Sequence, residues 1–180
     1  MDATPFLDLK PAAQVLFDSA ATRLDQPRYL VQRHGAWQPV TWRAHACAVR
    51  EVACGLQALG VQPGERGAVF APNRVAWMEA ALGLGTARAV MVPVYASNTA
   101  DQLAYVVGHA DAVVLFVDTL ALVAKLRAAW PAIAHTVRHV VVLDDDVAAV
   151  AQPAGDELAP HVCSMTALRG LGAVWDADHP

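Results

Sequence analysis

The sequence predicts an α/β fold: three layers, a mostly parallel sheet with helices on both faces, and an edge hairpin near the N-terminus. Two observations lead to this prediction. Short apolar runs, at 67–71, 89–94, 112–117 and 139–143, alternate with segments whose apolar residues recur at helical spacing. The chain has 180 residues, of which 56% are hydrophobic, so it can form one domain with a substantial core. Alternation of this kind favours right-handed crossovers between parallel strands.

The first elements precede the parallel strands. Pro11 opens an amphipathic segment that we expect to be helical and to stop at Asp25-Gln26-Pro27. The stretches 29–32 and 37–40 flank His34-Gly35 and are expected to pair as a hairpin. Pro39 lacks an N–H, which places its strand at an edge.

The next helix is expected over 43–59, where apolar residues gather on one face. Gly60 follows and can adopt the left-handed backbone that completes a helix end, and Gly64 then turns the chain into the first parallel strand. A helix from about 75 to 85 is apolar on most sides and leads to the second strand. Its part 75–84 is our leading candidate for an exposed apolar surface.

Two later helices have clear boundary signals. Thr99 and Gln102 form a capping box ahead of apolar residues at helical spacing. The segment 119–130 is expected to be a helix that ends at Pro131, because proline cannot continue a helix. Beyond it we divide the chain into residues 1–150, an α/β subdomain, and 151–180, an irregular segment that contains one short helix near 164–171.

A family-like pattern extends from Val40 to Asp118. Its pieces are Thr41-Trp42-Arg43, the run from Gly55 to Val61, Pro63 to Arg66, Pro72-Asn73-Arg74, Trp77, Val92 to Tyr95 and Asn98-Thr99. Together they resemble the amino-terminal part of long-chain fatty-acid CoA ligases, which are AMP-binding, adenylate-forming enzymes. The co-occurrence of the pieces is specific, although none is itself a catalytic motif. The structural positions that carry the resemblance are Thr41, Gly60, Gly64, Asn73, Trp77, Pro93, Tyr95 and Thr99.

The resemblance implies part of the adenylate-forming fold and, for the intact enzyme, ATP, Mg²⁺ and coenzyme A as cofactors. In such enzymes an acid and ATP give an acyl-adenylate, and coenzyme A then displaces AMP to form a thioester. The amino-terminal portion helps to wall the acyl channel and, in some long-chain members, contributes to dimer contacts. The implied partners are therefore the remainder of the parent enzyme, a second copy, and a fatty acid in the intact enzyme. No catalytic, cofactor-binding or metal residue is assigned in this chain.

The phosphate-binding loop of that family, a Thr/Ser/Gly-rich run that ends in Pro-Lys-Gly, does not occur in this sequence. The two lysines, Lys10 and Lys125, do not follow a glycine, and no glycine-rich stretch could cradle a phosphate. We therefore interpret the chain as an amino-terminal ligase fragment that is inactive alone. The alternative is a free-standing interaction or regulatory module without catalysis. A third hypothesis, a flavodoxin-like domain that binds a small ligand, depends on fold analogy alone.

One residue departs from the family pattern. This chain has Ala87-Arg88-Ala89 where the family usually has Ala-Gly-Ala. Either Arg88 points to solvent or a close approach of the backbone is altered.

Composition excludes some other functions. The net charge is −4 and the arginines are scattered, which argues against binding to nucleic acid. The start of the sequence lacks the features of a signal peptide, and no apolar stretch reaches the ~20 residues of a membrane span. We expect a cytoplasmic protein.

Several polar clusters allow competing interpretations. Asp144-Asp145-Asp146 follows a strand and could hold Mg²⁺, but a solvated loop and helix cap is favoured. His135 and His139 have the spacing of a helical metal pair, yet their segment reads as extended, so we assign no metal site.

Three cysteines and one tryptophan have simpler interpretations. Cys47, Cys54 and Cys163 are expected to be small buried hydrophobic residues. Trp77 either faces a fatty-acyl tunnel or belongs to the core, and the core is favoured.

Overall fold

The computed structural model describes residues 9–145 and 157–179, and it divides into two compact units, Met1–Ala48 and Val49–Pro180. Each unit is described separately. No helix within the described ranges is long and apolar enough to cross a membrane.

The first unit contains a helix, a hairpin and the start of a second helix. These are α1 Ala12–Arg23, β1 Pro27–Arg33, β2 Ala36–Thr41 and the first residues of α2 Trp42–Ala58. The two strands pair antiparallel as a sheet of their own, so both strands are edges and Pro39 lies on one, as expected. The turn at His34 and Gly35 has positive φ at both residues, 51° and 78°, which matches the right-handed twist of the strands.

The second unit is built on a five-stranded sheet in which every neighbouring pair is parallel, with the order β4-β3-β5-β6-β7. Its strands are β3 Arg66–Phe70, β4 Val90–Val94, β5 Ala112–Val117, β6 His139–Val142 and β7 Val162–Ser164. The first four confirm the strands expected from the apolar runs. The helices are the rest of α2, α3 Val75–Thr86, α4 Ala100–His109, α5 Leu120–Ile133 and α7 Met165–Asp178, with a short 3-10 helix η2 at Ala159–His161.

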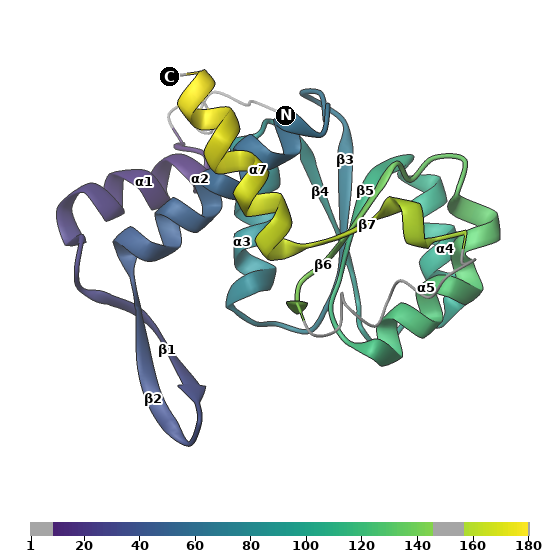
Figure 1. Cartoon of the computed structure of the whole chain (residues 1–180), viewed down its shortest axis with the longest axis horizontal. Helices are drawn as coiled ribbons and strands as arrows, with labels where there is room; N and C mark the ends of the chain where they lie inside the picture. The colour runs from purple at the N-terminus through teal and green to yellow at the C-terminus, as the bar shows by residue number, and fades with distance from the viewer. Residues whose placement is uncertain (1–8, 146–156, 180) are drawn as a thin grey trace. The chain divides into compact units, whose positions relative to one another are not determined.

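Helices cover both faces of this sheet, which confirms the three-layer prediction. One apolar cluster joins the sheet to α4 and α5, and a second joins the other face to α2, α3 and α7. Figure 1 shows α4 and α5 on one side of the strands and α3 and α7 on the other.

The description of 151–180 as irregular is wrong for its described part. β7 is the edge strand of the sheet and pairs with β6, and α7 extends well past the short helix expected there. Three strand residues are too few to show periodicity, so pairing with β6 rather than local pattern defines β7. Two ion pairs tie α7 to α2, Arg50 to Asp176 at 2.6 Å and Arg169 to Glu51 at 2.7 Å.

Two other expectations need correction. Helix α5 does not end at Pro131 but continues to Ile133. Trp130 and Ile133 are both buried in the core, so their packing holds the last turn in spite of the missing N–H of the proline. Helix α3 is not the exposed apolar surface that we expected. Its apolar side chains are partly or fully buried, and exposed ones lie elsewhere, for example at Leu171 and Val174 on α7.

Candidate functional site

The site is built at the carboxyl ends of the parallel strands. β3 connects through α3 to β4, on one side, whereas β5 connects through α5 to β6, on the other. Connections that leave neighbouring strands in opposite directions open a crevice, and ligands of α/β sheets commonly bind there. The candidate site is therefore formed by the residues that follow β3, β4 and β5.

An internal ion pair occupies the crevice between β3 and β5. The Nη1 atom of Arg74, just before α3, donates to Oδ1 of Asp118, just after β5, over 2.6 Å. Asp118 is 2% exposed, so this carboxylate is removed from water, and the guanidinium compensates for the loss of hydration. The pair fixes the loop after β3 to the end of β5.

A hollow of about 330 Å³ is lined by residues at the ends of β3 and β4. Its lining is mainly apolar and consists of Ala71, Pro72, Asn73, Trp77, Pro93, Val94, Tyr95, Ala96 and Ser97. Tyr95 is 78% exposed at its rim, whereas Trp77 is partly buried and also packs against the core. The indole of Trp77 therefore contributes to the core, as favoured, and it also lines the hollow, while a fatty-acyl tunnel at this place stays a prediction.

A lysine holds the loop that forms one wall of the hollow. The Nζ atom of Lys125, on α5, donates to the carbonyl oxygens of Ala96 and Asn98, at 3.1 and 2.8 Å. It also lies 6.0 Å from the ring centroid of Phe70, at the end of β3. This cation therefore links the loop after β4 to α5, in the layer that α4 and α5 form.

The structure brings together four of the eight family-like positions. Asn73, Trp77, Pro93 and Tyr95 all line the hollow. Thr99 lies a little further along the same loop, where its side chain accepts from the Gln102 N–H and completes the expected capping box.

The other three positions serve chain turns. In the first unit, Thr41 Oγ1 accepts from the N–H of Ala44 over 3.1 Å at the start of α2. Gly60 and Gly64, at φ 78° and 85°, lie before the amino end of β3. The N–H of Gly64 donates to the carbonyl of Arg88 over 2.8 Å, which fixes the entry to β3 beside the entry to β4.

Arg88 has the backbone that a glycine would adopt easily. Its φ is 63°, it is exposed, and its N–H donates to Gly85 while that of Ala89 donates to Leu84. This is the Schellman end of α3, in which the residue after the cap is usually glycine. Of the two alternatives, Arg88 points to solvent, and the preference for glycine here reflects backbone conformation.

In the part of the chain that the structure describes, the polar clusters that the sequence suggested do not assemble a metal site. Within 9–145 and 157–179, no three His, Cys, Asp or Glu side chains are placed to hold a metal ion. Asp145 accepts from Thr166 Oγ1 over 2.6 Å, and this hydrogen bond holds the pKa of its carboxyl below the usual value, while Asp146 lies outside the described residues. His139 Nε2 lies 3.1 Å from the Leu59 carbonyl, and burial lowers the pKa of its imidazole.

The residues at this edge also do not fit a nucleotide triphosphate with its Mg²⁺. Such an anion needs convergent N–H groups and available cations. Arg74 is paired with Asp118, and Lys125 donates to backbone carbonyls of the loop after β4. The loop from Ala71 to Arg74 contains no glycine. The described residues therefore provide a scaffold and an apolar wall, but no phosphate cradle.

The cysteines are free thiols, and the expectation that all three are buried is wrong for Cys47, which is exposed. Cys54 and Cys163 are half-buried, and burial is the main cause that raises the pKa of both thiols. A raised pKa disfavours the reactive thiolate, so neither of these two has the environment of a nucleophile.

Sequence reasoning did not identify Asp118 and Lys125 as site residues. The sequence could have identified Asp118, because a carboxylate directly after a continuous apolar strand lies at the carboxyl edge of a parallel sheet. No sequence pattern could have identified Lys125, since its partners are backbone carbonyls of a distant loop.

A parallel sheet of this topology with an apolar hollow at its carboxyl edge is an α/β architecture, a class in which ligands commonly bind at that edge. Comparison with known families makes the class specific. Residues 16–169 match the family model described as AMP-binding enzyme, so this chain belongs to the AMP-binding enzyme family.

Individual relatives agree with this assignment. The "Long-chain-fatty-acid--CoA ligase FadD15" of Mycobacterium tuberculosis is 35% identical over 115 residues, which are 61% of this chain and 19% of that ligase. The chain thus spans about a fifth of the length of the curated ligases it matches. The "Uncharacterized protein Rv1549" of the same organism is 32% identical over 114 residues, which are 63% of this chain and 65% of that protein.

The fold has close counterparts among solved structures. Coronafacic Acid Ligase from Pectobacterium brasiliense superposes with a TM-score of 0.71 over 88% of this chain and 29% of that one. The sequence identity is 11%, so this likeness concerns the fold alone.

Proposed function

We propose that this chain is the amino-terminal part of a long-chain fatty-acid CoA ligase and that it is inactive alone. The observation that supports the proposal is that, among the described residues at the carboxyl edge of the sheet, Arg74 is paired with Asp118 and Lys125 with the carbonyls of Ala96 and Asn98, and no glycine-rich loop lies beside them. The ATP, Mg²⁺ and coenzyme A of the intact enzyme would then be bound elsewhere in it. We place the protein in the cytoplasm, where these compounds are available.

In the intact enzyme, the hollow beside β3 and β4 would form part of the wall of the acyl channel. Trp77 and Pro93 supply apolar surface, and burial of a fatty-acyl chain gains roughly 0.8 kcal/mol for each methylene. The Arg74–Asp118 pair and Lys125 would keep this wall rigid. The remainder of the enzyme would then cover this surface. The same chain could also contribute contacts to a second copy of the enzyme.

A pyrophosphate-release assay with ATP, Mg²⁺ and palmitate tests the proposal. The chain alone should show no turnover, and the separately expressed remainder of a FadD15-like ligase should regain activity when this chain is added. Trp77→Ala should lower the restored activity with palmitate more than with a short acid, whereas Tyr105→Ala, an exposed change on α4, should leave both unchanged. Turnover by the chain alone at an ordinary enzyme rate would overturn the proposal.

A second candidate function is a free-standing interaction module. The similarity to Rv1549 favours it, because the matched region covers 65% of that protein and leaves little chain for catalytic parts. The same experiment separates the two candidates, since a free-standing module would not restore activity to any ligase remainder.

A further inference from the structure

A buried histidine without a hydrogen-bond partner lies in the first unit. His45, near the start of α2, is 0% exposed, and neither Nδ1 nor Nε2 of its ring has a partner among the described residues. The Tyr29 ring, on β1, meets the imidazole edge-on, with 5.1 Å between the ring centroids and 84° between the planes. Such groups are rare in folded proteins, because they lose hydration without compensation.

A second unpaired group contacts the same tyrosine. The guanidinium of Arg28 lies over two rings, with its Cζ atom 4.2 Å from the centroid of Trp42 and 5.2 Å from that of Tyr29. Its Nη1 atom is buried and, among the described residues, has no hydrogen-bond partner. The ring faces stabilise this cation in place of a carboxylate. The positive charge of Arg28 therefore acts on His45 without a neutralising anion.

This cluster lies where three elements of the unit meet. At the start of α2, the N–H of Trp42 donates to the carbonyl of Gln26 over 3.1 Å, and that of Arg43 donates to the carbonyl of Leu24 over 3.0 Å. Arg23, at the end of α1, lies over the same Trp42 ring at 5.2 Å. We call the cluster of side chains that joins α1, β1 and α2 the hairpin junction; it consists of Arg23, Arg28, Tyr29, Trp42 and His45.

The other charges of the unit offer no counterion to a protonated His45. The described part of the unit contains two carboxylates, and both have cationic partners: Asp18 accepts from Lys10 over 2.6 Å, and Asp25 accepts from Arg43 over 3.3 Å. The charged members of the hairpin junction on α1 and β1 are arginines, and β2 carries no ionisable side chain. A proton added to the buried imidazole would therefore create a second cation beside Arg28.

The hairpin junction thus accommodates the neutral imidazole. Burial, followed by the charge of Arg28, lowers the pKa of His45 to about 4. When the junction is open and the ring is in water, its pKa returns to the ordinary value of about 6.5. The closed junction binds the proton more weakly than the open one. Its stability is therefore complete above pH 6.5 and decreases as the pH falls from 6.5 towards 4.

We propose that His45 is an acid-sensitive switch of the first unit. Its protonation opens the hairpin junction and releases α1 and the β1–β2 hairpin from the start of α2, while the parallel sheet of the second unit stays folded. The proposal depends on the side chains of the first unit and is independent of the proposed ligase role.

Hydrogen exchange followed by NMR tests the proposal on the full chain. Protection factors, which are corrected for the direct effect of pH on exchange, are compared at pH 8 and pH 5. The amides of β1 and β2 should lose protection roughly thirtyfold at pH 5, the ratio expected for one proton whose pKa is 4 in the closed junction and 6.5 in the open one. The amides of β5, in the second unit, should keep their protection.

The imidazole signal gives a second measurement on the unaltered protein. The Cε1–H resonance of His45, assigned by its absence in His45→Phe, should titrate near pH 4. A midpoint near the ordinary ~6.5 would show that the closed junction tolerates the charge, and it would overturn the proposal.

Variants separate the switch from other effects of acid. His45→Phe keeps an aromatic ring but cannot be protonated, so the protection of the hairpin should be the same at pH 8 and pH 5. His34→Asn is the matched control, because this histidine of the hairpin turn is exposed and asparagine tolerates its φ of 51°. It should retain the thirtyfold change. Arg28→Met removes the neighbouring charge, so the midpoint of His45 should move to higher pH.

Three further results would overturn the proposal. The first is hairpin protection that does not change between pH 8 and pH 5 in the unaltered protein. The second is a full loss of protection at pH 5 in His45→Phe, which would assign the effect to another group. The third is an equal loss in the hairpin and in β5, which would mean that acid unfolds the whole chain.

Discussion

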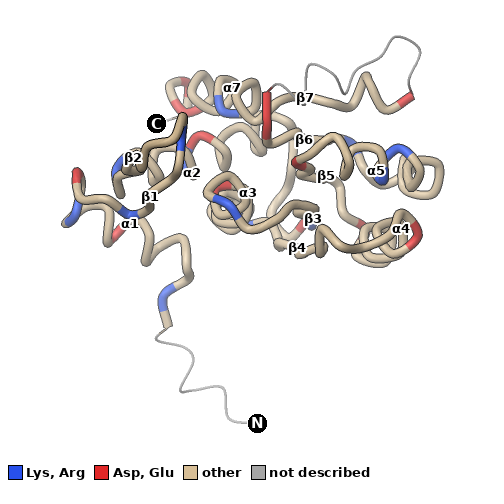
Figure 2. Tube along the Cα trace, turned by 90° about the horizontal axis from the view of Figure 1, so that it is seen from below, with Lys and Arg blue, Asp and Glu red and all other residues tan. Residues whose placement is uncertain are grey.

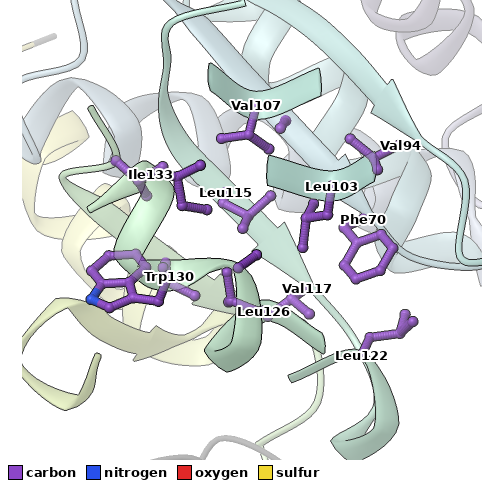
Figure 3. Packing of buried hydrophobic residues seen from close by; sticks show 14 of the residues in the cluster. Phe70, Val94, Leu103, Val107, Leu115, Val117, Leu122, Leu126, Trp130 and Ile133 are labelled. Atoms are coloured by element: carbon purple, nitrogen blue, oxygen red, sulfur yellow. The ribbon is translucent and has the colours of Figure 1, made fainter. Parts of the chain in front are cut away.

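The two faces of the parallel sheet are packed by different means. On the face covered by α4 and α5, large side chains interlock, and Figure 3 shows Phe70, Leu115, Leu126, Trp130 and Ile133 within this cluster. On the face covered by α2, α3 and α7, backbones also approach each other closely through glycine. At Gly172, on α7, an added Cβ atom would collide with the carbonyl oxygen of Glu51, on α2.

This difference shows that one sheet can obtain stability in two ways. The α4–α5 face depends on side-chain volume, so it should be sensitive to atoms that are removed. The α2–α7 contact depends on the absence of side chains, so it should be sensitive to atoms that are added. Substitutions in opposite directions can test this contrast.

The largest effect is expected from Gly172→Ala. The new methyl group meets backbone atoms of Glu51 and Gly55, which cannot rotate away, so α7 must move from α2. We expect a loss of roughly 4 kcal/mol in the free energy of unfolding, at the upper end of overpacking effects. Urea unfolding followed by circular dichroism measures it. Gly170→Ala is the control on the same helix, because its methyl group would meet nothing within 4 Å. Equal stabilities of the two variants would contradict the close packing of α7.

Leu126→Ala should have the next largest effect. The side chain is fully buried in the α4–α5 cluster, and its removal leaves a cavity, which costs about 3 kcal/mol. Thermal and urea unfolding should both report the loss. Leu120→Ala, on the same helix but 50% exposed, should change the stability by much less. A small effect at Leu126 would mean that this face can collapse to fill the space.

A smaller loss is expected from Gly60→Ala, at the end of α2. The added methyl group has open space around it, so the cost comes only from the left-handed backbone at φ 78°. For an L-residue this costs ~1.5 kcal/mol. Gly85→Ala in α3 is a useful comparison, because its methyl group also meets nothing and alanine favours a helix. Loss of stability in Gly85→Ala but not in Gly60→Ala would refute the conformational explanation.

The smallest effect, with the opposite sign, is expected from Arg88→Gly. Arg88 follows the end of α3 as Gly60 follows the end of α2. Because Arg88 has a side chain, its left-handed backbone costs conformational free energy that glycine avoids. Glycine should stabilise the protein by about 1 kcal/mol, partly offset by greater freedom of the unfolded chain. Arg88→Ala removes the charge and keeps the conformational cost, so it should change the midpoint of thermal unfolding little. If both variants are destabilised equally, the arginine side chain itself contributes to stability.

Much of the fold could be predicted because its signals are local. The apolar runs of the four strands and the capping box at Thr99 need no tertiary information. The end of α5 could not be read locally, because the packing of Trp130 and Ile133 overcomes the effect of Pro131. β7 could not be predicted, because its three residues form a strand only through their pairing with β6.

The candidate site could be predicted only in part. Asn73 and Tyr95 each come just after a parallel strand, so their common location at the carboxyl edge follows from the fold class. The Arg74–Asp118 pair joins residues 44 positions apart, and its formation depends on the order of the strands in the sheet. Figure 2 gives the distribution of charged residues along the chain trace, and the two members of each ion pair named above for the second unit lie far apart in the sequence.

The ion pairs between α2 and α7 have a consequence for biosynthesis. Arg50 and Asp176 are 126 positions apart, and Glu51 and Arg169 are 118 apart. On the ribosome, the α2 surface that α7 will cover stays without its partner while more than half of the chain is made, on the order of ten seconds at ordinary rates of synthesis. Until α7 arrives, this surface of α2 is open to other apolar partners, such as a chaperone that recognises apolar segments.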